Sequence, residues 1–186
     1  TTIHEYGISK DLLKELNKKL KNRPTAILIP CLYEEFERPA LKDIKEVLKN
    51  LNGLNELVIA LSAKSKEQAK AAKCFFDSMP FPVHIQWTNS PSVIELLKSQ
   101  EKNGLELLGT PGKGWAVWQG IGVATRKSEV VALFDADIRT FSSLYPSKMI
   151  LPLLDESFGI SYVKAFYSRL SLETNELQGR ATRLFV

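Results

Sequence analysis

The sequence predicts an α/β protein with a mainly parallel sheet, because short strand-like apolar runs alternate with segments of helical periodicity. No internal repeat and no low-complexity stretch interrupts this order. With 186 residues, the chain is long enough for one domain with a substantial core and too short for a second full domain. We therefore expect a single α/β domain.

Five short apolar runs are the expected strands, and they lie at residues 25–30, 56–61, 82–87, 129–134 and 160–167. The run at 129–134 is the most apolar of the five. The expected helices carry an apolar stripe or a start signal, and they lie at residues 9–20, 39–51, 65–77, 91–102, 115–126 and 148–154. Ser9 is expected to cap the first helix. Pro39 suits a first helical residue, and Ser65 with Gln68 forms a capping box.

The composition excludes several classes of protein. The apolar fraction of 44% and the charged fraction of 25% are those of an ordinary globular protein. The net charge of +4 is spread along the chain, whereas nucleic-acid binding needs a clustered basic face. No apolar run approaches the roughly 18 residues of a membrane span, and no signal-peptide pattern opens the chain. Cys31 and Cys74 lack metal-type spacing, which favours a reducing compartment. We expect a cytoplasmic location.

Two carboxylates follow the most apolar strand, in the segment Asp135-Ala136-Asp137. Open α/β sheets bind ligands beyond the carboxyl ends of their strands, and residues two apart in extended backbone point to the same side. Both carboxylates can then hold Mg²⁺ or Mn²⁺ against a diphosphate, since these ions prefer oxygen ligands. The alternative is a turn in which the two Asp side chains cap the next segment. The position after a buried strand favours the metal site.

Two further segments suit an anionic ligand. Gly112-Lys113-Gly114 opens a helix, whose N-terminus attracts anions; an ordinary loop-to-helix turn is the alternative, and the segment is not a Walker A loop. Pro30-Cys31-Leu32-Tyr33-Glu34-Glu35 follows the first strand, where acids can bind a base or a ribose. For this segment alone, the stronger interpretation is that the acids favour the N-terminus of the next helix.

Other chemistries lack support in the sequence. His4 and His84 are too isolated for a zinc site, and no nucleophile elbow or Ser-His-acid arrangement indicates acyl transfer. We expect Trp87, Trp115 and Trp118 in the core or in a pocket wall rather than in a stacking platform for nucleic acid.

Taken in order, these motifs resemble the nucleotide-sugar glycosyltransferases of the GT-A fold, and most of all the retaining glucosyl-3-phosphoglycerate synthases and their mannosyl relatives. The resemblance runs from about Arg23 to Val186 and rests on the combined order of the segments. It implies a Rossmann-like α/β/α sandwich, with residues 1–186 forming a single nucleotide-sugar-binding domain. It also implies transfer of glucose from UDP-glucose or another NDP-glucose to 3-phosphoglycerate, with retention and with Mg²⁺ or Mn²⁺ as cofactor.

The family's nucleoside loop is similar to the segment that begins at Pro30, although Cys31 and Tyr33 depart from its pattern. Its Asp-Ser-Gly segment resembles Leu61-Ser62-Ala63, where Ser62 matches and the Asp is lost. The resemblance implies that Asp137 is the metal ligand and that the catalytic residues are Lys113, Asp135 and Asp137. The implied nucleotide-sugar-binding residues are Pro30, Cys31, Leu32, Glu34, Ser62, Gly112, Lys113, Asp135 and Ala136.

Towards the end of the chain, residues 162–167 resemble a family strand, and Gly179-Arg180-Ala181-Thr182 resembles the family's acceptor loop. An Arg fork beside a hydroxyl suits a phosphorylated acid, so the resemblance implies that Gly179, Arg180 and Thr182 bind the acceptor. The alternative for Arg180 is an exposed cation. The family's third metal ligand, a His further downstream, has no counterpart in this chain. We therefore expect that these 186 residues bind nucleotide yet catalyse poorly or not at all, because the part that completes the metal and acceptor sites lies outside them.

The implied partners are UDP-glucose and 3-phosphoglycerate, with no nucleic acid, no membrane span and a homodimer left open. Two rival functions remain. The first is a related transferase that uses GDP-mannose, or an inverting enzyme that acts on a lipid or a polysaccharide. The second is a nucleotide-binding or regulatory module that does no chemistry.

Overall fold

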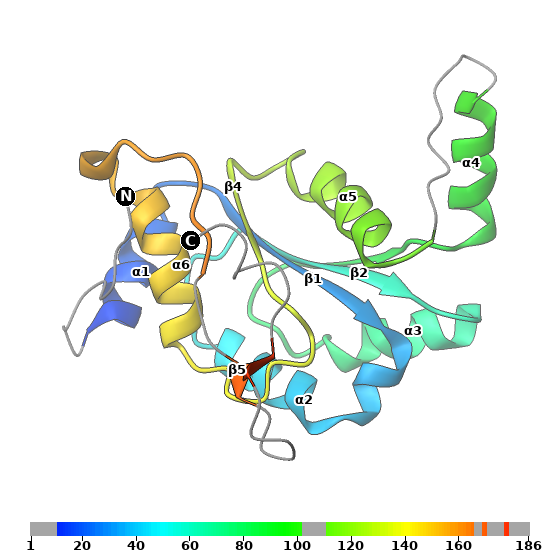
Figure 1. The fold of residues 1–186 in the computed structure, drawn as a ribbon, viewed down its shortest axis with the longest axis horizontal. Helices are drawn as coiled ribbons and strands as arrows, with labels where there is room; N and C mark the ends of the chain where they lie inside the picture. The colour runs from blue at the N-terminus through cyan, green and yellow to red at the C-terminus, as the bar shows by residue number, and fades with distance from the viewer. Residues whose placement is uncertain (1–10, 102–110, 166–168, 171–176, 179–186) are drawn as a thin grey trace.

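The computed structural model describes residues 11–101, 111–165, 169–170 and 177–178. A parallel sheet with the strand order β3-β2-β1-β4 lies at its centre (Figure 1). Its strands are β1 (Thr25–Leu32), β2 (Glu56–Ser62), β3 (Val83–Trp87) and β4 (Val130–Leu133). A short antiparallel pair, β5 (Arg169–Leu170) and β6 (Leu177–Gln178), follows. The predicted α/β class with a parallel sheet is confirmed.

Helices cover both faces of this sheet (Figure 1). They are α1 (Leu12–Leu20), α2 (Pro39–Leu48), α3 (Lys66–Phe75), α4 (Pro91–Glu101), α5 (Lys113–Ala124) and α6 (Leu144–Leu154), with the 3-10 turns η1 (Tyr33–Glu37) and η2 (Glu156–Phe158). In Figure 1, α2 and α3 lie below the sheet and α5 lies above it. Among the described residues, no helix is long and apolar enough to cross a membrane.

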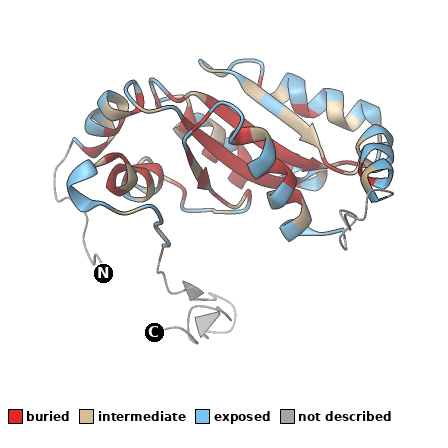
Figure 2. Ribbon diagram, turned by 90° about the horizontal axis from the view of Figure 1, so that it is seen from above, coloured by how far each residue is buried: buried red, intermediate tan, exposed pale blue. Residues whose placement is uncertain are grey.

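The two central strands are buried on both faces, as Figure 2 shows in red. Ile27 and Ile29 of β1 join the larger core with α1, α2, α3 and α6, whereas Ala26 and Leu28 face a smaller core under α5. Because helices cover both faces, β1 and β2 read as continuous apolar runs rather than as an alternation of apolar and polar residues. This continuity is the reason that the sequence predicts them within two residues.

Helix α5 lies close to the sheet because small residues face each other across the contact. Ala116 and Ala124 of α5 pack with Ala26 of β1 and Ala60 of β2. A methyl group added at Gly120 would overlap the buried Leu28 side chain and lie 3.2 Å from the Cβ of Ala60. The spacing between α5 and the sheet therefore depends on the missing side chain at position 120.

Several predicted boundaries differ from the structure. Asp11 occupies the N-cap position of α1, and the expected cap Ser9 lies outside the described residues. Helix α6 begins at Leu144 rather than at residue 148. The strand expected at 160–167 is wrong for residues 160–165, which form no strand.

The strand that precedes Asp135 was expected to be buried, and it is buried only in part. Strand β4 lies at the edge of the described sheet, and Leu133 is 44% exposed. Trp118, which was expected in the core or in a pocket wall, is half exposed on α5. Apolar composition alone does not distinguish a central strand from an edge strand, because the difference depends on which neighbours pair with it.

We expect Gly120→Val to lower the free energy of unfolding by about 1–3 kcal/mol, because overfilling a packed contact forces neighbouring side chains out of place. Gly122→Ala is the matched control on the same helix, since a Cβ there meets no atom within 4 Å. Its expected effect is neutral or stabilising by up to about 1 kcal/mol, because Ala favours a helix over Gly. Urea unfolding followed by circular dichroism measures both variants, and equal stability of the two would contradict the close packing.

Candidate functional site

The strand order of the described sheet reverses between β1 and β4. After β1, the chain adds β2 and then β3 on one side, and β4 then pairs with the other side of β1. Open α/β sheets bind ligands in the crevice outside the carboxyl ends of the strands at such a switch point. Strand β1 continues to Leu32, beyond Leu28, which is its last residue paired with β4. The topology therefore places the crevice between the end of β1 and the segment that follows β4.

The ends of β1 and β2 lie side by side. Leu32 is the register partner of Ser62, and Pro30 that of Ala60, so the predicted nucleoside loop starts beside the predicted Ser62 contact. Pro30 and Cys31 are buried, whereas Leu32 is 56% exposed. Burial, reinforced by the nearby carboxylates of Glu35 and Glu34, raises the pKa of the Cys31 thiol to about 12. Cys31 is therefore a packing residue rather than a nucleophile at neutral pH.

Glu34 pairs with Lys64 across the ends of β1 and β2. The Lys64 ammonium lies 2.9 Å from Oε1 of Glu34, and its hydrogen bond holds the pKa of Glu34 below the usual range. The same hydrogen bond raises the pKa of Lys64. Glu34 thus remains a carboxylate at neutral pH, and both side chains reach solvent.

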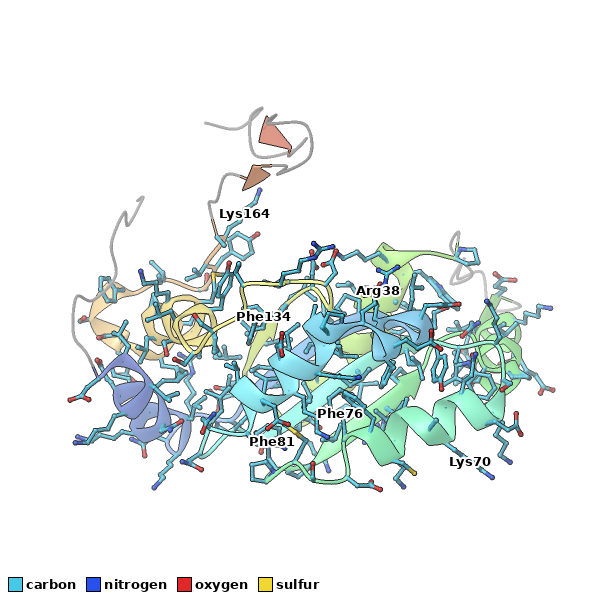
Figure 3. All side chains as sticks on the ribbon, turned by 90° about the horizontal axis from the view of Figure 1, so that it is seen from below. Arg38, Lys70, Phe76, Phe81, Phe134 and Lys164 are labelled. Carbon is cyan, nitrogen blue, oxygen red and sulfur yellow. The ribbon has the colours of Figure 1, made fainter. Side chains whose placement is uncertain are left out.

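The turn η1 that carries Glu34 is fixed by the residue next to it. Glu35 is buried, and its Oε1 accepts a hydrogen bond of 2.7 Å from Arg38 Nη1. Phe36 stacks on Tyr33 and meets the ring of Phe76 edge-on. Figure 3, which views the molecule from below relative to Figure 1, labels Arg38 and Phe76. The turn after β1 is therefore anchored to α3 by aromatic packing and to the start of α2 by an ion pair.

Lys113 and Asp135 connect the start of α5 to the segment after β4. The Nζ atom of Lys113 lies 2.5 Å from Oδ1 of Asp135, and the two side chains are 59% and 27% exposed. Because α5 runs from the carboxyl edge of the sheet back towards the start of β4, its N-terminus lies at the crevice. Gly112 occupies the N-cap position and has no side chain with which to cap the helix. A Cβ at Gly114 would meet no atom within 4 Å, so the start of α5 is open to an anion.

Aromatic packing fixes the segment that carries the two predicted carboxylates. Phe134 donates its backbone N–H to the carbonyl of Leu28, and its ring meets Phe141 edge-on at 5.4 Å. Ala136 between the carboxylates is buried, whereas Asp137 is exposed. Ala136 and Asp137 form a turn rather than extended backbone. The alternation expected for a strand therefore does not apply to this segment, and its orientation is set by the two buried Phe rings.

The carboxylates suit a divalent cation that takes most of its ligands from elsewhere. Within the described residues, no group of three His, Cys, Asp or Glu side chains could hold a metal ion. Mg²⁺ is commonly bound through one or two protein carboxylates together with phosphate oxygens and water. The exposed carboxylate of Asp137, next to an Asp135 already paired with Lys113, fits this type of site. The donor set therefore fits Mg²⁺ or Mn²⁺ with a diphosphate.

The predicted acceptor residues Gly179, Arg180 and Thr182 lie outside the described residues, and their roles stay predictions. The roles of Pro30, Leu32, Glu34, Ser62, Gly112, Lys113, Asp135, Ala136 and Asp137 also stay predictions. What the structure adds is their arrangement in two neighbouring groups, one at the ends of β1 and β2 and one at α5 and β4.

Sequence reasoning missed Lys64 and the residues that fix its loop. The Asn89 carboxamide makes two hydrogen bonds with Ala63, accepting from its N–H at 3.1 Å and donating to its carbonyl at 3.0 Å. The indole N–H of Trp87 donates to the same carbonyl at 3.0 Å. Ser65 caps α3 by accepting from Gln68 N, as predicted, while the Gln68 side chain accepts from the backbone N–H of Lys64. Their positions at the ends of β2 and β3 were the signal in the sequence that could have identified them as residues near the ligand-binding edge.

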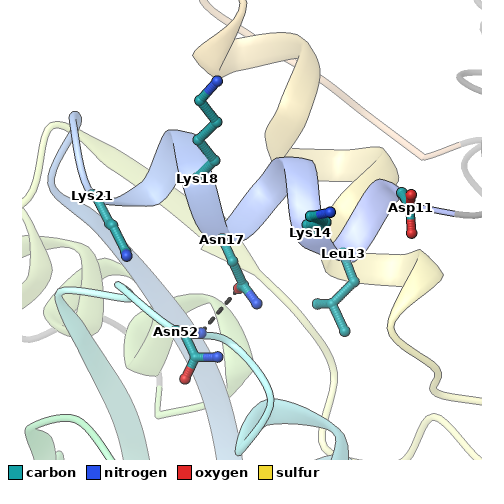
Figure 4. Close-up of a pocket in the computed structure, with 7 residues that line it drawn as sticks. All are labelled: Asp11, Leu13, Lys14, Asn17, Lys18, Lys21 and Asn52. Atoms are coloured by element: carbon teal, nitrogen blue, oxygen red, sulfur yellow. Dashed lines mark hydrogen bonds between the residues drawn. The ribbon is translucent and has the colours of Figure 1, made fainter.

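A separate hollow of about 580 Å³ lies along α1 (Figure 4). It is lined by Asp11, Leu13, Lys14, Asn17, Lys18, Lys21 and Asn52. Its residues precede β1 and β2, so the hollow lies towards the amino ends of the strands, on the other side from the crevice. Asn17 fixes the loop before β2 by accepting from the backbone N–H of Asn52 at 2.9 Å. The hollow shares no residue with the predicted site.

Solved structures of other proteins share this fold. The structure resembles crystal structures of Mycobacterium tuberculosis glucosyl-3-phosphoglycerate synthase. One has a TM-score of 0.59 at 22% identity and covers 91% of this chain and 54% of that chain. Another, in complex with Mn²⁺, UDP and phosphoglyceric acid, has a TM-score of 0.51 at 19% identity, covering 82% of this chain and 45% of that chain. The fold is therefore the GT-A type α/β fold, as predicted.

Two proteins with similar sequences are glucosyl-3-phosphoglycerate synthases. The chain is 35% identical over its whole length to a glucosyl-3-phosphoglycerate synthase of Methanococcoides burtonii, covering 46% of that protein. It is 30% identical to the Persephonella marina enzyme over 95% of this chain and 43% of that protein. No family model matches the chain. The chain is thus related to the glucosyl-3-phosphoglycerate synthases and spans about half the length of these relatives, which confirms the predicted resemblance.

We expect one thiol to react in the folded protein and two after unfolding. Cys74 is exposed and Cys31 is buried, and only a thiolate reacts readily with an alkylating reagent. Because the pKa of Cys31 is raised to about 12, its thiol stays protonated and unreactive at pH 8. Mass spectrometry after iodoacetamide treatment counts the labelled thiols, with Cys74→Ser as the control that should leave none. Rapid labelling of Cys31 in that variant would contradict the buried loop after β1.

Proposed function

We propose that this chain binds a nucleotide-sugar donor for transfer of glucose from UDP-glucose to 3-phosphoglycerate, with retention at the anomeric carbon. The observation that carries the proposal is the Lys113–Asp135 ion pair at the switch point of the sheet, next to the exposed carboxylate of Asp137. The similarity of this chain to about half the length of two glucosyl-3-phosphoglycerate synthases supports the reaction. We place the reaction in the cytoplasm.

The nucleoside end of the donor lies at the ends of β1 and β2 in this proposal. Leu32 and Ser62 are register partners there, and the carboxylate of Glu34 can accept hydrogen bonds from a base or ribose. Pro30 and Cys31 are buried, so they contribute backbone and shape rather than reactive groups. The Ser62 hydroxyl can donate or accept a hydrogen bond at the same place.

The diphosphate end lies between α5 and β4. The N-terminus of α5, together with the ammonium of Lys113, favours the negative charge of a diphosphate. Asp135 orients Lys113 through their ion pair, and Asp137 would hold the divalent cation. Structures of the Mycobacterium tuberculosis enzyme were determined with UDP and either Mn²⁺ or Mg²⁺, which supports these ions here. When bound, such a cation stabilises the negative charge that builds up on the departing diphosphate.

The acceptor end rests on Gly179, Arg180 and Thr182, whose types suit a phosphorylated carboxylic acid. Another crystal structure of the Mycobacterium tuberculosis enzyme contains Mn²⁺, UDP-glucose and phosphoglyceric acid. That ligand set supports glucose as the transferred sugar. In this proposal the acceptor hydroxyl attacks the anomeric carbon from the face that the diphosphate leaves. The new bond to the acceptor oxygen then forms as the bond to the diphosphate breaks, and the configuration is retained without a covalent enzyme intermediate.

We expect Asp137→Ala to lower metal-dependent transfer by about 10²–10³-fold, because it removes a group that stabilises charge developing in the transition state. The assay measures nucleotide release from UDP-glucose with 3-phosphoglycerate and Mn²⁺, in the protein at its natural length. GDP-mannose is tested in parallel. Asp43→Ala, an exposed Asp on α2, is the control that should leave turnover unchanged.

Three results would contradict parts of this proposal. Undiminished turnover of Asp137→Ala with a circular-dichroism spectrum like that of the unaltered protein would remove the metal role. Turnover of GDP-mannose alone would overturn the donor. Binding of UDP with Mn²⁺ in calorimetry, without turnover of any donor by the protein at its natural length, would favour a nucleotide-binding module without chemistry.

A further inference from the structure

Lys64 lies at the nucleoside end of the proposed site, and no motif in the sequence assigns it a role. Its ammonium pairs with the carboxylate of Glu34 at 2.9 Å, although the two residues come from different strand-end loops. The Lys64 side chain is 80% exposed and that of Glu34 is 49% exposed. An ion pair between exposed side chains contributes little to folding stability. The pair is therefore positioned where a ligand can reach it, and the fold does not depend on it.

The loop that presents Lys64 is held by several hydrogen bonds. Asn89 binds both the N–H and the carbonyl of Ala63, and Trp87 adds a third hydrogen bond to that carbonyl. The backbone N–H of Lys64 itself donates to Gln68 Oε1 at 2.7 Å. The end of β3 and the start of α3 thus fix the backbone on both sides of residue 64. This fixed backbone limits where the ammonium can reach.

The partner loop is equally restrained. Glu34 lies in η1, where the neighbouring residues Glu35 and Phe36 are buried. Two restrained backbones therefore lie at the ends of β1 and β2, and the ion pair of Glu34 with Lys64 bridges them. A free Glu side chain samples many rotamers, and ordering it on ligand binding costs free energy. An ammonium that already holds the carboxylate removes part of that cost.

We propose that Lys64 is a positioning residue of the nucleotide site, which orders the Glu34 carboxylate to accept hydrogen bonds from the nucleoside of a nucleoside diphosphate. The inference rests on the proposed function, since Glu34 is the nucleoside contact there. Lys64 acts through Glu34 rather than on the diphosphate, because the diphosphate end lies between α5 and β4. A carboxylate oxygen can accept more than one hydrogen bond, so Lys64 and the nucleoside can be bound together.

The test measures the dissociation constant of UDP by calorimetry with Mn²⁺, and the steady-state constants for UDP-glucose, in the protein at its natural length. We expect Lys64→Met to weaken UDP binding by about 3- to 10-fold, which corresponds to the cost of ordering one long side chain. The KM for UDP-glucose should rise by a similar factor with kcat unchanged. Lys64→Arg should restore most of the affinity. Lys70→Met, which removes the same charge from the exposed face of α3 (Figure 3), should have no effect.

A double-mutant cycle with Glu34→Ala decides whether Lys64 acts through Glu34. On the Glu34→Ala background, Lys64→Met should change the UDP dissociation constant by less than about 1.5-fold, since the carboxylate that Lys64 orders is gone. Equal weakening on both backgrounds would overturn the inference, because it would mean that Lys64 attracts the phosphates directly. Unchanged UDP binding by Lys64→Met alone would also overturn it while leaving the proposed function intact. Failure of the unaltered protein to bind UDP would overturn both.

Discussion

The parallel pairing of β1 with β4 is the constraint on which the site depends. It places the segment after β4 next to the end of β1, and it creates the switch point at which an open α/β sheet can bind a ligand. The crossover through α5 then brings the N-terminus of that helix to the same edge. The Lys113–Asp135 ion pair is the direct contact that results from this arrangement. A different strand order would separate the cation of α5 from the carboxylates of the loop.

The small residues beneath α5 serve the same arrangement. Gly120, with the Ala residues around it, allows the helix to lie close to β1 and β2, which fixes where the helix begins as well as how it packs. On the other face, Phe36 and its ring neighbours anchor η1, while Phe134 and Phe141 hold the loop after β4. Polar groups at the edge are thus carried by backbone that buried apolar side chains hold in place. Catalytic and binding groups generally need such support to keep their geometry.

The central strands were predictable because burial on both faces leaves a continuous apolar run, as in β1 and β2. The position of β4 at the edge of the described sheet was not predictable, since Val130 to Leu133 is as apolar as a central strand. Only the strand pairing and the exposure of Leu133 reveal it. At the site, the acids that follow a predicted strand pointed to Asp135, and the glycines at the start of a predicted helix pointed to Lys113. The Glu34–Lys64 pair escaped prediction because it depends on the register between two strands. A turn at Ala136 and Asp137 was predicted only as the alternative, because the apolar run extends beyond the end of the strand.

The most direct test of the convergence of these loops is nuclear magnetic resonance of the isotopically labelled protein with UDP and Mn²⁺. Paramagnetic Mn²⁺ broadens the signals of nearby amides. We expect the strongest broadening at Asp135 to Asp137 and at the start of α5, with weaker effects at the end of β1. The amides of α1 around its hollow should keep their line widths. Broadening centred on α1, or none at Asp137 when UDP is bound, would contradict the account.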